Sequence, residues 1–290
     1  MNALLITISI IYLIGVMGNH NYLNILINNS IIVLKYHYKE GDTLKNTALL
    51  VPLAGVVKMT VQVKGASCSL SESLITRLLS LGTSVICDNQ PHHQQINSVL
   101  LTHSEAKLLD SGNAFSISFD NSDADIVIGV DLIISDLIPS RPDNKWSAQP
   151  FLAWAQGEST FSDNVNWWLA EADAASAIAR ICRAKKLCDA IELCGRRSWK
   201  EIDTFSEFSN LWQRTVMGQS GNFTPQILSH KPISGMDAIP ITEESATRPK
   251  LDATHSLLNE IDGEGWRPLT PLRTALMTLI AGIIEYRQPD

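Results

Sequence analysis

Gly65 and Asp88 are the two residues whose types and spacing indicate chemistry most directly. Gly65 opens the run Gly65-Ala66-Ser67-Cys68-Ser69-Leu70-Ser71, in which all but one of the side chains are small. A helix that begins here would present oriented N–H donors and a partial positive charge, and such helix ends bind anions. Asp88 follows 23 residues after Gly65, where a carboxylate can accept hydrogen bonds from ribose hydroxyl groups. The pattern therefore predicts a ligand with phosphate and ribose groups.

The elements around these residues are those that could position them. Residues 60–64 are rich in β-branched side chains and predict a buried strand, and residues 83–87 predict a second one. Between them, residues 72–81 show apolar side chains at helical spacing, and Gly82 suits the end of that helix. Strand, turn, helix, strand and acid within about thirty residues form the βαβ layout of a dinucleotide site.

The same segment resembles the short-chain dehydrogenase/reductase superfamily, whose fingerprint is Gly-x-x-Gly-x-x-Gly. Here Gly65-x-x-Cys68-x-x-Ser71 keeps the first glycine, and Lys64-Gly65-Ala66-Ser67 is similar to the family's Thr-Gly-Ala-Ser opening. The resemblance implies NAD, or NADP, as the cofactor. The cofactor-binding residues that it implies are Gly65, Ser67, Cys68, Ser71 and Asp88. If position 68 requires a positive φ, its cysteine would cost about 1 kcal/mol or more.

The C-terminal half carries further parts of this resemblance. Residues 124–138 predict one or two buried strands, which end at Pro139-Ser140-Arg141-Pro142-Asp143. The stretch 166–178 and the tail, with Arg248-Pro249, Gly265-Trp266-Arg267-Pro268 and an amphipathic segment 271–286, are similar to nucleotide-sugar epimerases and dTDP-4-dehydrorhamnose reductases. A nucleotide-activated sugar is the substrate that this implies. Arg141 and Arg267 are the candidate substrate-binding residues, because Arg suits bidentate phosphate contacts.

The catalytic signature of that family, Tyr-x-x-x-Lys, is absent from the sequence. Only about 40 residues separate Asp88 from the strand expected near Ile126, too few for three βα units. The catalytic residues therefore stay unknown, and two hypotheses stay open. One is an NAD(P)-dependent oxidoreductase or epimerase with impaired catalysis, and the other is a non-catalytic Rossmann-like binding or scaffolding remnant. Fewer than six parallel strands would favour the remnant, whereas a Tyr or Ser over an open nicotinamide pocket would favour the enzyme.

Composition bounds the other classes of function. The net charge of −7 argues against nucleic-acid binding, and five cysteines without a CxxC pair argue against a disulfide framework or a metal site. A reducing cytoplasm and a homodimer are compatible with these features. His92 and His93 in Pro-His-His-Gln-Gln are interpreted as part of a polar surface loop.

The first 58 residues differ from the rest of the chain. Residues 1–34 contain no charged side chain, and the run from Ala3 to Gly18 is apolar. Three interpretations are open: a segment outside the working domain, a membrane anchor, or a signal peptide. Membrane contact is expected only through residues 1–34, and a second apolar patch, Ala48 to Val57, precedes the first predicted strand.

The predicted fold is α/β, with a Rossmann-like, mostly parallel sheet of reduced strand number and a small C-terminal substrate-type subdomain. The expected parts are residues 1–58, an apolar extension; 59–145, the dinucleotide-binding part; and 146–290, the C-terminal part.

Overall fold

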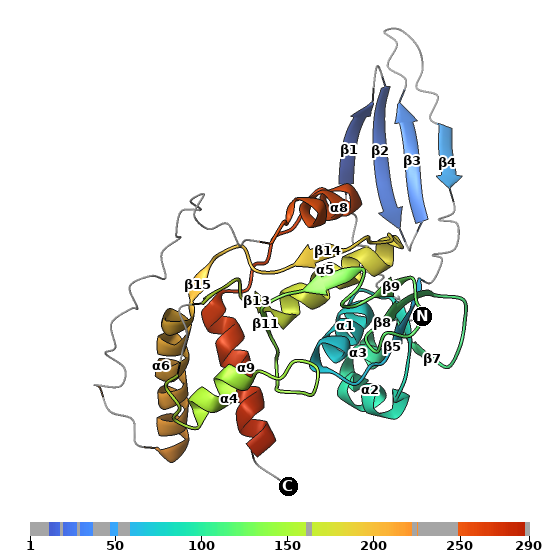
Figure 1. The fold of residues 1–290 in the computed structure, drawn as a ribbon. Helices are drawn as coiled ribbons and strands as arrows, with labels where there is room; N and C mark the ends of the chain where they lie inside the picture. The colour runs from blue at the N-terminus through green and yellow to red at the C-terminus, as the bar shows by residue number, and fades with distance from the viewer. Residues whose placement is uncertain are drawn as a thin grey trace. The chain divides into compact units, whose positions relative to one another are not determined.

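The computed structural model describes residues 12–17, 20–27, 30–36, 47–51, 59–160, 164–221, 225 and 249–287. By its internal contacts the chain divides into two compact units, residues 1–58 and residues 59–290 (Figure 1).

The first unit contains a four-stranded antiparallel sheet of consecutive strands. It consists of β1 (Tyr12–Met17), β2 (His20–Ile27), β3 (Ser30–Tyr36) and β4 (Thr47–Val51), in the order β1-β2-β3-β4. The apolar run from Ala3 to Gly18 is described only from Tyr12 to Met17, where it forms β1. The patch from Ala48 to Val57 begins inside the edge strand β4, and residues 52–58 lie outside the described residues. Within the described ranges, no helix has the length and apolarity needed to cross a membrane.

The second unit is built on a five-stranded parallel sheet. Its strands are β5 (Thr60–Lys64), β6 (Ser84–Cys87), β7 (Leu108–Leu109), β8 (Phe115–Ser118) and β9 (Ile126–Val127). Their spatial order is β7-β6-β5-β8-β9, and every pairing is parallel. Along the chain, β6 and β7 are added on one side of β5, and β8 and β9 are then added on its other side, as in a Rossmann sheet. The predicted fold class and the predicted strands at 60–64 and 83–87 are confirmed.

Helices cover one face of this sheet. α1 (Ser69–Ser80) connects β5 to β6, and α2 (Gln90–Ile96) with α3 (Ser98–His103) connects β6 to β7. Both connections step in the same direction along the sheet, so right-handed crossovers place these helices on the same face. α1 buries Leu70, Leu74, Ile75, Leu78 and Leu79 completely, in one core with Val61 and Val63 of β5.

The opposite face of the sheet has no crossover helix. Residues 110–114 and 119–125, which connect β7 to β8 and β8 to β9, are all described and contain none. The side chains that the register directs to this face are mostly polar, including Gln62 beside Ser116 and Lys64 beside Ser118. Parallel sheets are normally apolar on both faces because helices cover both. Here the strand sequences have adapted to a sheet with a single helical layer.

Among its described residues, the rest of the unit contributes paired short strands and five helices. β10 (Leu132–Ile134) and β14 (Ile191–Leu193) pair in parallel, as do β11 (Leu137–Ile138) and β13 (Leu169–Ala170). β12 (Val165–Asn166) and β15 (Trp199–Lys200) pair antiparallel. The segment 124–138 therefore holds three short strands, and the prediction of one or two was wrong. α5 (Glu171–Ala184) packs on α1, and α8 (Asp252–Asp262) packs on α5.

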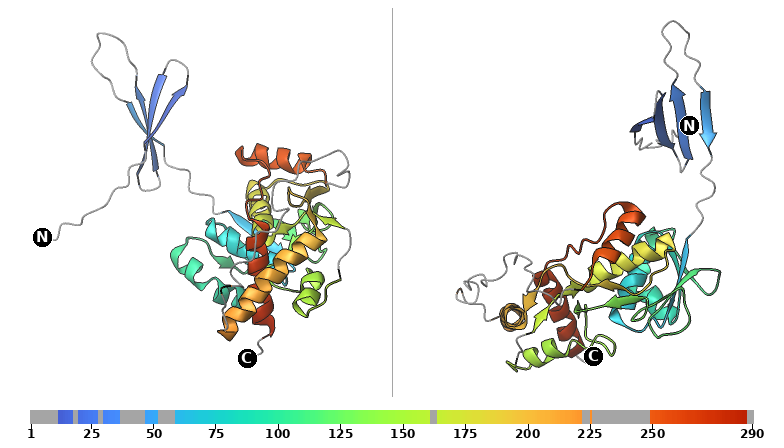
Figure 2. Two further views of the ribbon diagram at one scale, coloured as in Figure 1. Left: turned by 90° about the vertical axis from the view of Figure 1, so that its left-hand side faces the viewer. Right: turned by 45° about the horizontal axis from the view of Figure 1, so that its top comes forward.

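A second, smaller core lies among the remaining helices. α4 (Gln149–Ala155), α6 (Glu201–Ser220) and α9 (Leu272–Arg287) enclose Phe151, Trp154 and Phe208. Figure 1 and both views of Figure 2 show these helices grouped together, apart from α1, α2 and α3. The predicted boundary between residues 145 and 146 stays a prediction, since residues 59–290 form one unit by their contacts.

Candidate functional site

The turn after β5 is shaped by Gly65. Its φ is +67°, in the left-handed region that favours glycine. A Cβ on Gly65 would lie 2.7 Å from Cβ and 2.9 Å from the backbone nitrogen of Asp120, which follows β8. The turn therefore needs glycine for its conformation and for its close contact with the neighbouring strand end. This is the edge of the sheet where the strand order reverses between β5 and β8, the position at which such sheets bind ligands.

Asp88 lies directly beside this turn. The N–H of Gly65 donates a hydrogen bond to Oδ2 of Asp88 at 3.1 Å. The bond joins the carboxyl ends of β5 and β6, so the structure brings together the two residues that the sequence singled out. Asp88 is exposed, and Oδ1 has no partner among the described residues. An incoming hydroxyl group could donate to it.

Cys68 and Ser71 form the beginning of α1 instead of opening it to a ligand. The hydroxyl of Ser71 accepts the N–H of Cys68 at 3.1 Å and donates to the carbonyl oxygen of Cys68 at 2.7 Å. Cys68 has φ −113° and ψ 161°, an extended conformation that any residue adopts. The condition under which cysteine would be strained at position 68 is therefore not met. Both side chains are buried, so their part in the site is to cap the helix.

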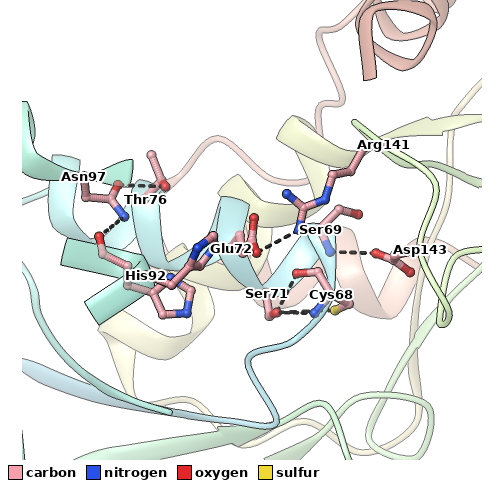
Figure 3. Close-up of polar contacts among 10 residues, drawn as sticks. Cys68, Ser69, Ser71, Glu72, Thr76, His92, Asn97, Arg141 and Asp143 are labelled. Atoms are coloured by element: carbon pink, nitrogen blue, oxygen red, sulfur yellow. Dashed lines mark hydrogen bonds and ion pairs between the residues drawn. The ribbon is translucent and has the colours of Figure 1, made fainter. Parts of the chain in front are cut away.

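An acid from a distant loop occupies the first turn of α1. The N–H of Ser69 donates to Oδ2 of Asp143 at 2.6 Å, across 74 residues of sequence (Figure 3). Asp143 is the last residue of the Pro-rich segment 139–143, which directly follows β11. Ser67 is exposed, and its N–H donates to the carbonyl of Gly65 at 2.8 Å. Three of the first five amides of the turn, those of Gly65, Cys68 and Ser69, thus bond to side chains of this chain.

Glu72 connects the helix to its surroundings. Its Oε1 lies 3.0 Å from Nε2 of His92 on α2 and accepts a hydrogen bond from Arg141 at 2.7 Å (Figure 3). The hydrogen bond to Glu72 raises the pKa of Arg141, although partial burial acts in the opposite direction. Arg141 is thus near the predicted site, but its guanidinium group is paired within the protein.

Arg267 lies on the connection between α8 and α9. It is exposed, and no hydrogen bond or ion pair among the described residues joins it to the Gly65 turn or to Arg141. Its neighbour Trp266 is buried, with its indole N–H donated to the carbonyl of Cys194 at 3.0 Å. The structure therefore brings Gly65, Cys68, Ser71, Asp88 and Arg141 to one region, and it records no contact between Arg267 and them.

The interpretation of His92 and His93 as part of a polar surface loop is wrong, because both lie on α2. His93 is 0% exposed, and neither of its ring nitrogens makes a hydrogen bond of good geometry in the described part of the chain. Burial and the neighbouring His92 lower the pKa of His93, while Glu72, the backbone of Ala66 and Asp88 act in the opposite direction. The imidazole thus lies poorly satisfied against the Gly65 turn, a costly arrangement for a buried polar group.

Sequence reasoning missed four residues of this region: Glu72, His93, Asp120 and Asp143. A local signal existed for His93, because Pro91 after Gln90 is typical of a helix start. Asp120 and Asp143 reach the site from other strand ends, and no local pattern reveals that. Within the described residues, no three His, Cys, Asp or Glu side chains gather so that they could hold a metal ion.

Strand order, turn and acid together define a Rossmann-like α/β protein. No protein-family model matches the chain, and no curated protein matches its sequence. Solved structures that match include dTDP-glucose 4,6-dehydratase from Bacillus anthracis in complex with NAD. The identity is 9%, the TM-score is 0.45, and the match covers 79% of this chain and 97% of that one.

Two further matches are of the same kind. The enzyme WbmG from Bordetella bronchiseptica in complex with NAD is 10% identical, with a TM-score of 0.42 over 81% of this chain and 96% of that one. UDP-glucose 4-epimerase from Thermotoga maritima with UDP-glucose is 12% identical, with a TM-score of 0.41 over 79% and 100%. By their names, two of these three proteins act on nucleotide-activated glucose.

Proposed function

We propose that the chain binds NAD at the β5–α1–β6 edge, as a divergent protein of the type that acts on nucleotide-activated sugars. The observation that carries the proposal is the hydrogen bond from the Gly65 N–H to Asp88 at 3.1 Å. It holds a carboxylate at the end of the second strand, next to a turn that requires glycine and at the point where the strand order reverses. A carboxylate in this position suits the hydroxyl groups of the adenosine ribose and repels a 2′-phosphate.

The residues of the site fit the adenosine ribose of NAD better than they fit its phosphate groups. At the ribose end, Asp88 is exposed and keeps one carboxylate oxygen free for a hydroxyl group among the described contacts. At the phosphate end, the amide of Ser69 is already bonded to Asp143, so the helix end is not open as it stands. A bound nicotinamide would supply hydride-transfer chemistry, whereas proton transfer would need a side chain of this chain.

The residues that would catalyse a reaction on a nucleotide sugar are not recognisable in this chain. The sequence contains no Tyr-x-x-x-Lys. The segments that connect β7 to β8 and β8 to β9 contain no helix that could carry such a motif. We therefore expect catalysis to be impaired. A non-catalytic binding or scaffolding role is the second candidate, and the count of five parallel strands in the central sheet supports it. Cytoplasmic location and assembly as a homodimer stay predictions from the sequence.

Calorimetric titration of the full chain with NAD⁺ and NADP⁺ tests the proposal. We expect NAD⁺ to bind at least about tenfold more tightly than NADP⁺, because Asp88 repels the 2′-phosphate. Asp88→Ala should weaken NAD⁺ binding and also reduce the preference for NAD⁺ over NADP⁺, which a merely structural defect would not do. The matched control is Asp110→Ala, which removes an exposed acid on the β7–β8 connection. No heat with either nucleotide from a folded sample would contradict the proposal.

The nucleotide-sugar half of the proposal needs its own measurement. UDP-glucose titrated into the NAD⁺-loaded protein should bind, and Arg267→Ala should weaken that binding if Arg267 contacts its phosphates. Arg267 suits this test because it is exposed and has no recorded partner in the described residues, so its replacement should leave the fold intact. Conversion of UDP-glucose to another nucleotide sugar, followed by chromatography together with NADH absorbance, would show turnover. Unchanged UDP-glucose and no NADH from a protein that binds both ligands would favour the non-catalytic role.

A further inference from the structure

The amino end of α1 is occupied by this chain's own acceptors. The amide of Cys68 bonds to Oγ of Ser71 at 3.1 Å, and the amide of Ser69 bonds to Asp143 at 2.6 Å. One residue earlier, the amide of Ser67 bonds to the carbonyl of Gly65 at 2.8 Å. These amides belong to the segment that presents donors to phosphate groups in Rossmann proteins. A ligand phosphate would meet a carboxylate at the first amide of the helix.

The loop that carries Asp143 is firmly held. Oδ1 of Asp143 accepts the N–H groups of Lys145 at 2.8 Å and Trp146 at 2.6 Å, which fixes the carboxylate in a turn. The N–H of Ser140 donates to Glu171 at 2.8 Å, and α9 packs so closely that a Cβ on Gly282 would lie 2.3 Å from the carbonyl oxygen of Ser140. The carboxylate is therefore positioned by its surroundings, and its second oxygen, Oδ2, is directed to α1.

The charges around the Gly65 turn also oppose the binding of a ligand phosphate. Asp88 and Asp120 flank the Gly65 turn, and Asp143 adds a third carboxylate at the helix end. The nearby Arg141, which could have balanced a phosphate, is paired with Glu72 at 2.7 Å. A carboxylate at a helix N-terminus interacts favourably with the helix dipole, as a phosphate would. Asp143 therefore satisfies the same donors and the same dipole that a ligand phosphate would require.

We propose that Asp143 is an intramolecular substitute for a ligand phosphate, so that the loop from Ser140 to Trp146 closes the phosphate end of the site. A phosphate-bearing ligand then has to displace the carboxylate from the amide of Ser69. This inference rests on the proposed nucleotide site and names what regulates access to it.

His93 is an independent sign that a polar group belongs at this turn. Its ring is 0% exposed and lies against the backbone of Ala66, and neither ring nitrogen makes a hydrogen bond of good geometry in the described part of the chain. A buried imidazole without a well-formed hydrogen bond costs free energy that a bound polar group would recover. The turn thus carries a buried, poorly satisfied imidazole next to a helix end that the protein itself has filled.

The test is calorimetric titration of the full chain with inorganic pyrophosphate and, separately, with NAD⁺. Asp143→Asn keeps one side-chain oxygen for Lys145 and Trp146 but loses the charged acceptor for Ser69. We expect this variant to bind pyrophosphate and NAD⁺ at least about tenfold more tightly than the native chain. The matched control is Asp123→Asn, which removes the same charge from an exposed acid on the β8–β9 connection and should leave both affinities unchanged.

The outcomes separate this inference from the proposed function. A gain with pyrophosphate but no binding of NAD⁺ to any variant supports the inference and contradicts the dinucleotide site. NAD⁺ binding that is equal in the native chain and Asp143→Asn overturns the inference and leaves the dinucleotide site standing. Pyrophosphate binding that is the same in all three proteins also overturns it, provided that urea unfolding shows Asp143→Asn to be folded.

Discussion

Gly65 and Asp120 are in direct contact just after the neighbouring strands β5 and β8 end. A Cβ on Gly65 would lie 2.7 Å from Cβ and 2.8 Å from Cγ of Asp120. Asp120 is itself fixed, because its Oδ1 accepts the hydroxyl of Ser118 at 2.9 Å and the N–H of Ser122 at 3.1 Å. The glycine of this turn is thus required by the fold itself.

Gly65→Ala is therefore expected to destabilise the protein by two separate causes. The positive φ of +67° costs about 1 kcal/mol for a residue with a Cβ, and the overlap with Asp120 should add about 1 to 3 kcal/mol. Gly82→Ala is the matched control, since Gly82 has φ +75° and nothing within 4 Å of the added atom. Urea unfolding of both variants should show the larger loss for Gly65→Ala. Equal losses would mean that Asp120 moves aside without cost.

The sequence predicts the β5–α1–β6 part of the fold because all its signals are local. β-branched runs, apolar side chains at helical spacing and Gly82 lie within one short segment, and β5 and β6 follow from them. The helix begins three residues before the predicted Glu72, because Cys68 and Ser71 cap it through their own hydrogen bonds. Cysteine is not among the residues preferred at that position, so the cap gave no signal.

The sequence of β8 also indicates a sheet with helices on one face only. β8 has the sequence Phe-Ser-Ile-Ser, in which Phe115 and Ile117 pair with Val61 and Val63 on the core side. Such alternation is typical of a sheet with helices on only one face, although Ser116 and Ser118 are themselves buried. The contact between Asp143 and Ser69 could not be read in this way, because it joins residues 74 positions apart through a loop of irregular structure.

Phe208 is expected to contribute most to the second core. It is 0% exposed on α6, and its ring lies 5.6 Å from Phe151 and 5.8 Å from Trp154, measured between centroids. Phe208→Ala should lower the free energy of unfolding by about 3 to 5 kcal/mol, because it removes buried apolar surface and leaves a cavity. Val216→Ala on the same helix is the control, since Val216 is 42% exposed and should change stability by less than about 0.5 kcal/mol. Similar losses in urea unfolding would contradict the packing described for α6.

The ion pair between Arg180 and Asp262 should make stability depend on pH. Nε of Arg180 donates to Oδ2 of Asp262 at 2.5 Å, and a second bond joins the other oxygen to the guanidinium group. The hydrogen bond from Arg180 lowers the pKa of Asp262 below its usual value of 3.8. Because the folded pKa is the lower one, the stabilisation is complete above the unfolded pKa and is lost as the pH falls through the folded pKa.

Asp262→Asn is therefore expected to cost about 1 kcal/mol at pH 7, an amount that suits a partly exposed pair. The difference from the native chain should shrink as the pH falls below about 4 and vanish once Asp262 is protonated in the folded state. Urea unfolding at a series of pH values measures it. Asp189→Asn, at an exposed position after α5, should show no such trend. A difference that persists at pH 2 would point to lost packing instead of lost charge.

Cys188 is expected to react slowly although it is only partly buried. Burial, followed by the charge of Asp131, raises the pKa of its thiol from 9.0 to about 11. Only the thiolate is nucleophilic, so at pH 8 its rate of alkylation by iodoacetamide should be about 100-fold below that of the unfolded chain. Between pH 8 and pH 10 the rate should rise about tenfold per pH unit without levelling off. Cys182, whose pKa is also raised and which is 0% exposed, should stay unmodified in the folded protein over the same range. Peptide mass spectrometry resolves the two sites, and a rate at Cys188 that levels off near pH 9 would mean that its thiol is solvated and Asp131 is too far away to matter.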